Sequence, residues 1–102
     1  MDLERARFNM IEQQIRPWDV LDQQVLDSLY VVRREAFVPT AYRMLAFSDI
    51  EIPLGDGQAM MQPKVEARIL QEVAPGPNDH VLEIGTGSGY LAALIAALAR
   101  VG

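Results

Sequence analysis

Val81-Leu82-Glu83-Ile84-Gly85-Thr86-Gly87-Ser88-Gly89-Tyr90 is the stretch that decides which fold the sequence predicts. Its first four residues are expected to form a short apolar strand and its glycines a loop. The alanine-rich apolar segment from Tyr90 to Arg100 is expected to form a helix. A helix that follows a glycine loop presents unpaired N–H groups and a partial positive charge to a bound anion or polar group. We therefore predict a nucleotide-type cofactor at the carboxyl end of the first strand of a parallel sheet.

The spacing of the glycines narrows the kind of cofactor. A dinucleotide fingerprint requires the pattern G-x-G-x-x-G. After Gly85 and Gly87 the position of the third glycine is occupied by Tyr90, and glycine comes one residue early, at Gly89. This register disfavours an NAD-dependent oxidoreductase.

Upstream of the loop, the sequence predicts a mainly helical portion. Leu3 to Ile15 carries apolar residues at helical spacing, and Pro17 ends that pattern. Asp19 or Asp22 can cap a second helix that runs to about Val32. The apolar positions of this second helix are Val25, Leu26 and Leu29.

A polar exit, an irregular segment and a third helix are expected next. Arg33 to Glu35 form the polar exit, and Tyr42 to Gly57 is predicted to be irregular with a short strand, ending in a glycine turn at Gly55 to Gly57. Pro63 suits the first position of a helix, which the turn from Pro75 to Asp79 ends. On that helix one stripe is apolar, formed by Val65, Ile69 and Val73 with Leu70 beside it.

The turn from Pro75 to Asp79 is also the one predicted boundary. It separates residues 1–74, a helical N-terminal portion with a loop, from residues 80–102, which supply the first strand, the glycine loop and the first helix of a cofactor-binding domain. The predicted fold class is therefore α/β: the start of a Rossmann-like doubly wound fold, truncated at Gly102 and preceded by a mainly helical portion.

Composition excludes several classes of protein. The chain has 102 residues and a formal net charge of −5, so it lacks the basic footprint that a nucleic-acid backbone requires. It has no cysteine, which fits a reducing compartment, and its N-terminus is acidic where a secretory signal would be basic. The longest apolar run, Leu91 to Ala99, is too short to cross a bilayer. We expect a cytoplasmic protein that binds neither nucleic acid nor membranes.

The ten residues from Val81 to Tyr90 resemble motif I of the class I methyltransferases, and their sequence is most similar to that motif in the protein-L-isoaspartate O-methyltransferase family. Upstream stretches resemble the same family, in order and at family spacing, so the resemblance extends over nearly the whole chain. They are Met10 to Ile15, Arg34-Glu35-Ala36-Phe37-Val38-Pro39, Ala46-Phe47-Ser48-Asp49, and the family's signature loop, Ile52-Pro53-Leu54-Gly55-Asp56-Gly57-Gln58.

The resemblance implies S-adenosyl-L-methionine as cofactor, a methyltransferase fold, and methyl transfer to a protein or peptide carboxylate, the chemistry of isoaspartyl repair. It implies that Gly85, Thr86, Gly87 and Ser88 line the methionine part of the donor, with Glu83 near its amino end and Gly89 in the same loop. Without a ligand, the same ten residues would be a buried strand followed by a tight turn.

The chain departs from the family after the signature loop. The typical run is Thr-Ile-Ser-Ala-Pro-His, whereas this chain has Ala59-Met60-Met61-Gln62-Pro63-Lys64, so Met61 occupies the position of the serine. A thioether cannot donate a hydrogen bond, and no catalytic residue is assigned here. Either Met60 and Met61 fill an apolar gap, or they mark a divergent subgroup with another acceptor or weak activity.

Four other residues are given structural roles. Trp18 is expected to anchor the core, Lys64 to be solvated, and Asp49 to be an exposed loop carboxylate, although the resemblance places Asp49 in a segment that can approach the acceptor. His80 has no second ligand-type residue near it, so no metal site is predicted.

The leading functional hypothesis is a methyltransferase whose N-terminal part is this chain. The acidic residue that binds ribose in such folds would follow Gly102, so we expect the chain alone to bind little donor and to be inactive. We also expect the truncated chain to self-associate through Val81 to Ala99. The alternatives are a non-catalytic binding or interaction module of the same fold and, disfavoured by its glycine register, an NAD-dependent oxidoreductase.

Overall fold

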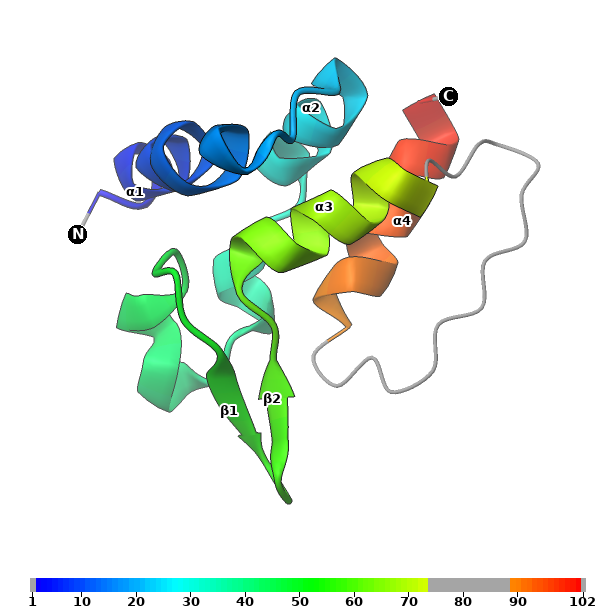
Figure 1. The fold of residues 1–102 in the computed structure, drawn as a ribbon. Helices are drawn as coiled ribbons and strands as arrows, with labels where there is room; N and C mark the ends of the chain where they lie inside the picture. Colours follow the sequence, from blue (N-terminus) through cyan, green and yellow to red (C-terminus); the bar gives the residue numbers. More distant parts are fainter. Residues whose placement is uncertain (1, 74–88, 102) are drawn as a thin grey trace.

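Four α-helices and one β-hairpin make up most of the computed structural model, which describes residues 2–73 and 89–101 (Figure 1). Helices α1, α2, α3 and α4 gather at one end, and the hairpin of β1 and β2 extends from the other. The strand predicted at Val81 to Ile84, most of the glycine loop and the predicted boundary turn lie outside the described residues.

The first helical segment changes its winding along its length. α1 spans Leu3–Met10, with Asp2 accepting a hydrogen bond from the backbone N–H of Arg5 at 3.1 Å. It continues as a π-helical stretch, η1 (Ile11–Ile15), and a 3-10 turn, η2 (Arg16–Trp18). The predicted helix is therefore confirmed, and three of its apolar positions, Met10, Ile11 and Ile15, are buried.

The second helix, α2, spans Gln23–Val31 and is also confirmed. Its cap is Asp22 rather than Asp19, because the Asp22 carboxylate accepts from the backbone N–H of Gln24 at 2.9 Å. Asp19 instead adopts a left-handed backbone with φ 62° after η2. The predicted apolar positions Val25, Leu26 and Leu29 are all buried.

The segment after α2 corrects the prediction of a polar exit. It forms two short 3-10 helices, η3 (Arg34–Phe37) and η4 (Thr40–Leu45). Arg34 has no exposed surface and Glu35 is 8% exposed. Charged side chains are rarely buried unless they are paired, and both of these have buried partners.

The hairpin contains the predicted strand and a second one that the sequence pattern did not indicate. β1 (Ile52–Gly55) pairs antiparallel with β2 (Gln58–Met60), and Ile52 lies opposite Met60. Gly55 and Gly57 have φ values of +96° and +75°, which confirms the predicted glycine turn.

The helices α3 (Pro63–Val73) and α4 (Tyr90–Val101) complete the described fold. The stripe predicted for α3 is wrong, because Ile69 and Val73 are 37% and 54% exposed. Leu70, predicted beside the stripe, is buried as expected, and the helix is turned so that Glu66 and Ala67 are buried with it.

Helix α4 packs on α2 and α3, so it belongs to the same core as the N-terminal helices. Among its residues 90–98, whose burial the structure describes, Tyr90, Leu91, Leu94 and Leu98 are buried there. Within residues 2–73 and 89–101, no helix has the length and apolar character needed to cross a membrane.

Candidate active site

The Met60–Met61 segment leads from β2 into α3, and its two side chains differ in burial. Met60 is 3% exposed and belongs to the core, whereas Met61 is half-buried and packs against that core. This placement supports the gap-filling interpretation for Met60. The backbone carbonyl of Met61 accepts a hydrogen bond from Arg34 at 2.9 Å.

Arg34 connects that segment to three other parts of the chain. Its Nε donates to the carbonyl of Ala46 at 2.7 Å, and its Nη1 donates to the carboxylate of Glu66 on α3 at 2.7 Å. The guanidinium carbon lies 4.8 Å from the centre of the Tyr90 ring, at the start of α4. One buried cation therefore contacts the Met60–Met61 segment, α3 and α4 together.

Tyr90 is buried directly after the only described glycine of the predicted donor loop. Its ring lies 5.7 Å from that of Phe37, centre to centre, and burial raises the pKa of its phenol to about 12, against the opposing effect of Arg34. Gly89 has a φ of +83°, and a β-carbon there would lie 3.9 Å from the Phe37 ring. Only the backbone of Gly89 therefore requires glycine, because the space around it would admit a methyl group.

A second buried arginine holds the segment that precedes Asp49. Arg7 pairs with Glu4 and, more closely, with Glu35, and its guanidinium carbon lies 5.1 Å from the centre of the Phe47 ring. Burial alone would raise the pKa of the Glu35 carboxyl, but the hydrogen bond and charge of Arg7 outweigh it and lower that pKa. Gln14 adds a hydrogen bond from Nε2 to the carbonyl of Phe47 at 2.8 Å.

Asp49, Lys64 and Trp18 form a chain of contacts on the surface. Asp49 is exposed, as expected, but it pairs with Lys64 at 3.2 Å. The Lys64 ammonium also lies 4.9 Å from the centre of the Trp18 ring, so the lysine that was predicted to be solvated is only 22% exposed and has two partners. Trp18 is 44% exposed, which corrects its predicted role as a core anchor; it supports Lys64 from outside the core.

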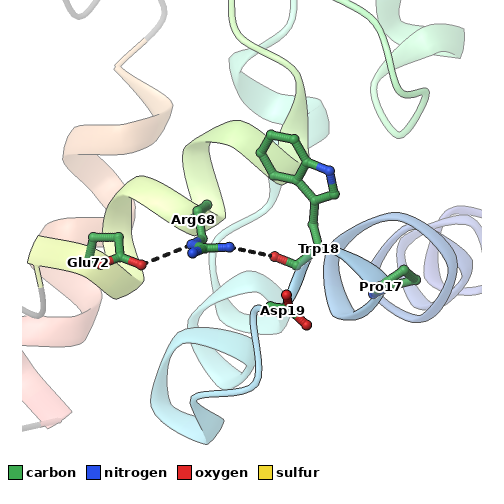
Figure 2. A pocket seen from close by; sticks show the side chains of 5 residues that line it. All are labelled: Pro17, Trp18, Asp19, Arg68 and Glu72. Carbon is green, nitrogen blue, oxygen red and sulfur yellow. Dashed lines mark hydrogen bonds and ion pairs between the residues drawn. The ribbon is translucent and has the colours of Figure 1, made fainter.

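A hollow of about 540 Å³ lies beside Trp18 (Figure 2). It is lined by Pro17, Trp18, Asp19, Arg68 and Glu72. Arg68 donates to the carbonyl of Trp18 at 3.1 Å and pairs with Glu72 at 2.9 Å, so its guanidinium is already engaged by the chain itself. We therefore place the candidate site where Arg34 contacts Met61 and Tyr90, and not at this hollow.

The predicted donor residues are divided by the limits of the described structure. Glu83, Gly85, Thr86, Gly87 and Ser88 lie outside the described residues, as does His80, and their roles stay predictions. Gly89 is described, and the first turn of α4 behind it contains no acidic side chain. The described end of the loop therefore fits a ligand with a polar or anionic group.

Arg34 and Tyr90 are the site residues that sequence reasoning missed. Both stand inside stretches that carry the family resemblance, which was the available signal. Within the described residues, no group of three or more His, Asp or Glu side chains is arranged to hold a metal ion.

The described residues form a helical portion with a small two-stranded sheet, followed by Gly89 and α4, and this arrangement is consistent with the start of a methyltransferase fold. Residues 5–101 match the family model described as protein-L-isoaspartate(D-aspartate) O-methyltransferase. The chain belongs to this family.

Curated relatives agree with that assignment. The chain is 40% identical to the protein-L-isoaspartate O-methyltransferase of Petrotoga mobilis, over 99% of this chain and 47% of that protein. It is 41% identical to the enzyme of that name from Herpetosiphon aurantiacus, over 95% of this chain and 43% of the relative. It is 42% identical to the enzyme of that name from Aeropyrum pernix, over 95% of this chain and 37% of the relative. The chain thus spans less than half the length of these relatives.

Proposed function

We propose that the protein to which this chain belongs transfers a methyl group from S-adenosyl-L-methionine to a carboxylate of a protein or peptide, with L-isoaspartyl sites as the default acceptor. The observation that carries the proposal is the contact of Arg34 with both the Met61 carbonyl and the Tyr90 ring. It joins the segment that follows the signature loop to the helix that follows the glycine loop. Family membership supplies the reaction class.

In methyl transfer to a carboxylate, the main task of the protein is to position the donor and the acceptor. The donor supplies an activated methyl group, and a carboxylate with a reference pKa of about 4 is ionised at neutral pH, so no general base is needed. Holding two reactants in line can lower the barrier by roughly 7–11 kcal/mol. In this proposal Gly85, Thr86, Gly87 and Ser88 hold the donor with Glu83 and Gly89, and the chain continues as a Rossmann-like doubly wound sheet.

Met61 sets this chain apart from the typical enzyme. Its half-buried thioether packs against the core at the position where the family has a serine hydroxyl. A hydroxyl can orient an acceptor carboxylate by donating a hydrogen bond, and a thioether cannot. We therefore expect slow methylation of isoaspartyl sites, or a preference for another carboxylate acceptor.

The thioether of Met61 also favours one alternative, a binding module of the methyltransferase fold that has lost its activity. Such a module would recognise a protein without methylating it. Self-association through Val81 to Ala99 stays a prediction, although Leu91, Leu94 and Leu98 of that stretch are buried within the chain. Placement in the cytoplasm also stays a prediction.

The proposal is tested on the complete product of the gene with isotopically labelled S-adenosyl-L-methionine. Two peptides of one sequence are compared, the first with an L-isoaspartyl residue and the second with aspartate at that position. Label on the isoaspartyl peptide alone supports the proposal, and a low rate supports the role given to Met61. Donor binding in calorimetry without transfer to any carboxylate would favour the module, and absence of donor binding would contradict both.

A further inference from the structure

We infer that Arg34 is a positioning residue for methyl transfer, which fixes the main chain of Met61 relative to the first turn of α4. The inference rests on the proposed function, because it gives a catalytic meaning to a contact between two segments that would flank donor and acceptor. Arg34 is not expected to touch either reactant itself.

The geometry of the guanidinium makes the contact specific. Its Nε, Nη1 and Nη2 donate to the carbonyl of Ala46, to Glu66 and to the carbonyl of Met61 at 2.7, 2.7 and 2.9 Å. A guanidinium is planar and its donors have fixed directions, so these three acceptors are fixed relative to one another. The side chain is fully buried, and a lysine ammonium could not reproduce this fork.

The fourth contact links these three acceptors to the helix that follows the predicted donor loop. The Tyr90 ring lies 4.8 Å from the guanidinium carbon, and Tyr90 follows Gly89 directly. On the other side Arg34 binds the main chain of Met61, so the hold does not depend on which side chain stands at that position. One side chain thus contacts both segments.

Arg7 provides a matched comparison within the same chain. It is as fully buried as Arg34, pairs with two carboxylates, Glu4 and Glu35, and lies against an aromatic ring, that of Phe47. Its ion pairs and its ring contact lie on Glu4, Glu35 and Phe47 and not on Met61 or α4, and only its charge acts on the Tyr90 phenol. A buried arginine that only stabilises the fold should therefore behave as Arg7 does.

The test compares Arg34→Lys with Arg7→Lys in the complete gene product, at a temperature where both variants are folded by circular dichroism. Steady-state kinetics give kcat and the KM of donor and acceptor, and amide hydrogen exchange is followed over residues 58–62 and 89–94. For Arg34→Lys we expect kcat to fall roughly ten- to a hundredfold, with less than about a threefold change in donor KM. Exchange should increase in both segments.

For Arg7→Lys we expect kcat and the exchange of those two segments to stay near those of the wild type. Equal kcat for the two variants would overturn the inference, as would unchanged exchange at residues 58–62 in Arg34→Lys. If Arg34→Lys does not fold, Tyr90→Leu takes its place, because it removes the α4 side of the contact and leaves the hydrogen bonds of Arg34 to Ala46, Glu66 and Met61. Wild-type protein that methylates no carboxylate would overturn the proposed function, and the exchange data would then still decide whether Arg34 joins the two segments.

Discussion

Arg34 and Glu66 form an ion pair at 2.7 Å in which both side chains are shielded from solvent, with 0% and 4% of their surfaces exposed. The two residues lie 32 positions apart and join η3 to α3. Burying two charges is costly, and the pair offsets this cost only while both partners and their further hydrogen bonds are present.

Removing one partner should therefore destabilise the fold strongly. We expect Glu66→Ala to lower the free energy of unfolding by about 3–5 kcal/mol, because it leaves the Arg34 charge buried beside the lost carboxylate. Glu72→Ala on the same helix is the control, since its pair with Arg68 is exposed and should contribute less than about 1 kcal/mol. Urea denaturation measures both, and similar losses for the two variants would contradict this account of the buried pair.

Gln71 is expected to hold the loop before α2. Its Oε1 accepts from the backbone N–H groups of Leu21 and Asp22 at 2.9 and 3.0 Å, and its Nε2 donates to the carbonyl of Asp19 at 2.9 Å. We expect Gln71→Ala to cost about 1–2 kcal/mol in thermal or urea unfolding, because three hydrogen bonds are lost at an exposed site. Gln24→Ala, at an exposed position of α2, should cost little; a loss as large as that of Gln71→Ala would show that helix composition is responsible.

The helices were predictable because local rules determine them. The apolar spacing of α2 and its Asp22 cap are readable within a few residues, and α4 was indicated by its alanine-rich run. The buried face of α3 was not, because Glu66 is drawn into the core by Arg34, far away in sequence. A pattern of apolar residues cannot show that a carboxylate will be buried, so it placed Leu70 correctly but assigned Ile69 and Val73 to the buried face.

The candidate site was predictable only as a set of motifs. The resemblance marked the segments around Arg34, Met61 and Tyr90, but it did not show that one side chain joins them. Charged residues are normally placed on the surface, and the burial of Arg34 depends on acceptors from three distant segments. Trp18 was misplaced in the opposite direction: it was expected in the core, but it is 44% exposed and contacts Lys64 on the surface.

The buried phenol of Tyr90 should make stability depend on pH on the alkaline side. Its folded-state pKa is raised to about 12, above an unfolded value of about 10, so the folded state holds the phenolic proton more tightly. The resulting stability, about 2–3 kcal/mol, is fully present below pH 10 and is lost as pH rises through 12. Chemical unfolding at pH 9 and pH 11.5 gives the fall in unfolding free energy between the two pH values. We expect this fall to be smaller for Tyr90→Phe than for the wild type, and equal falls would rule out the phenol as the cause.

Alanine substitutions at Gly89 and Gly57 should lower stability to a similar extent but should differ in their effect on donor binding. Both have positive φ, +83° and +75°, and a β-carbon would meet no closer neighbour than the Phe37 ring at 3.9 Å. We expect each alanine variant to cost about 1–2 kcal/mol of unfolding free energy, because the backbone is left-handed. In calorimetry on the complete gene product, only Gly89→Ala should weaken binding of S-adenosyl-L-methionine. Equal weakening by Gly57→Ala would remove the special role given to the end of the glycine loop.

Met61→Ser restores the hydroxyl that the typical family member has at this position. Because Arg34 holds the Met61 main chain, the new side chain should start from the same backbone position as the thioether. We expect methylation of an isoaspartyl peptide by the complete gene product to rise about tenfold or more, since one well-placed hydrogen-bond donor can change a rate by roughly 10²–10³. Met61→Ala is the control, because it removes the same half-buried side chain without adding a donor. If the serine and alanine variants have the same rate, the missing hydroxyl does not limit the reaction, and the preference for another acceptor becomes the explanation to pursue.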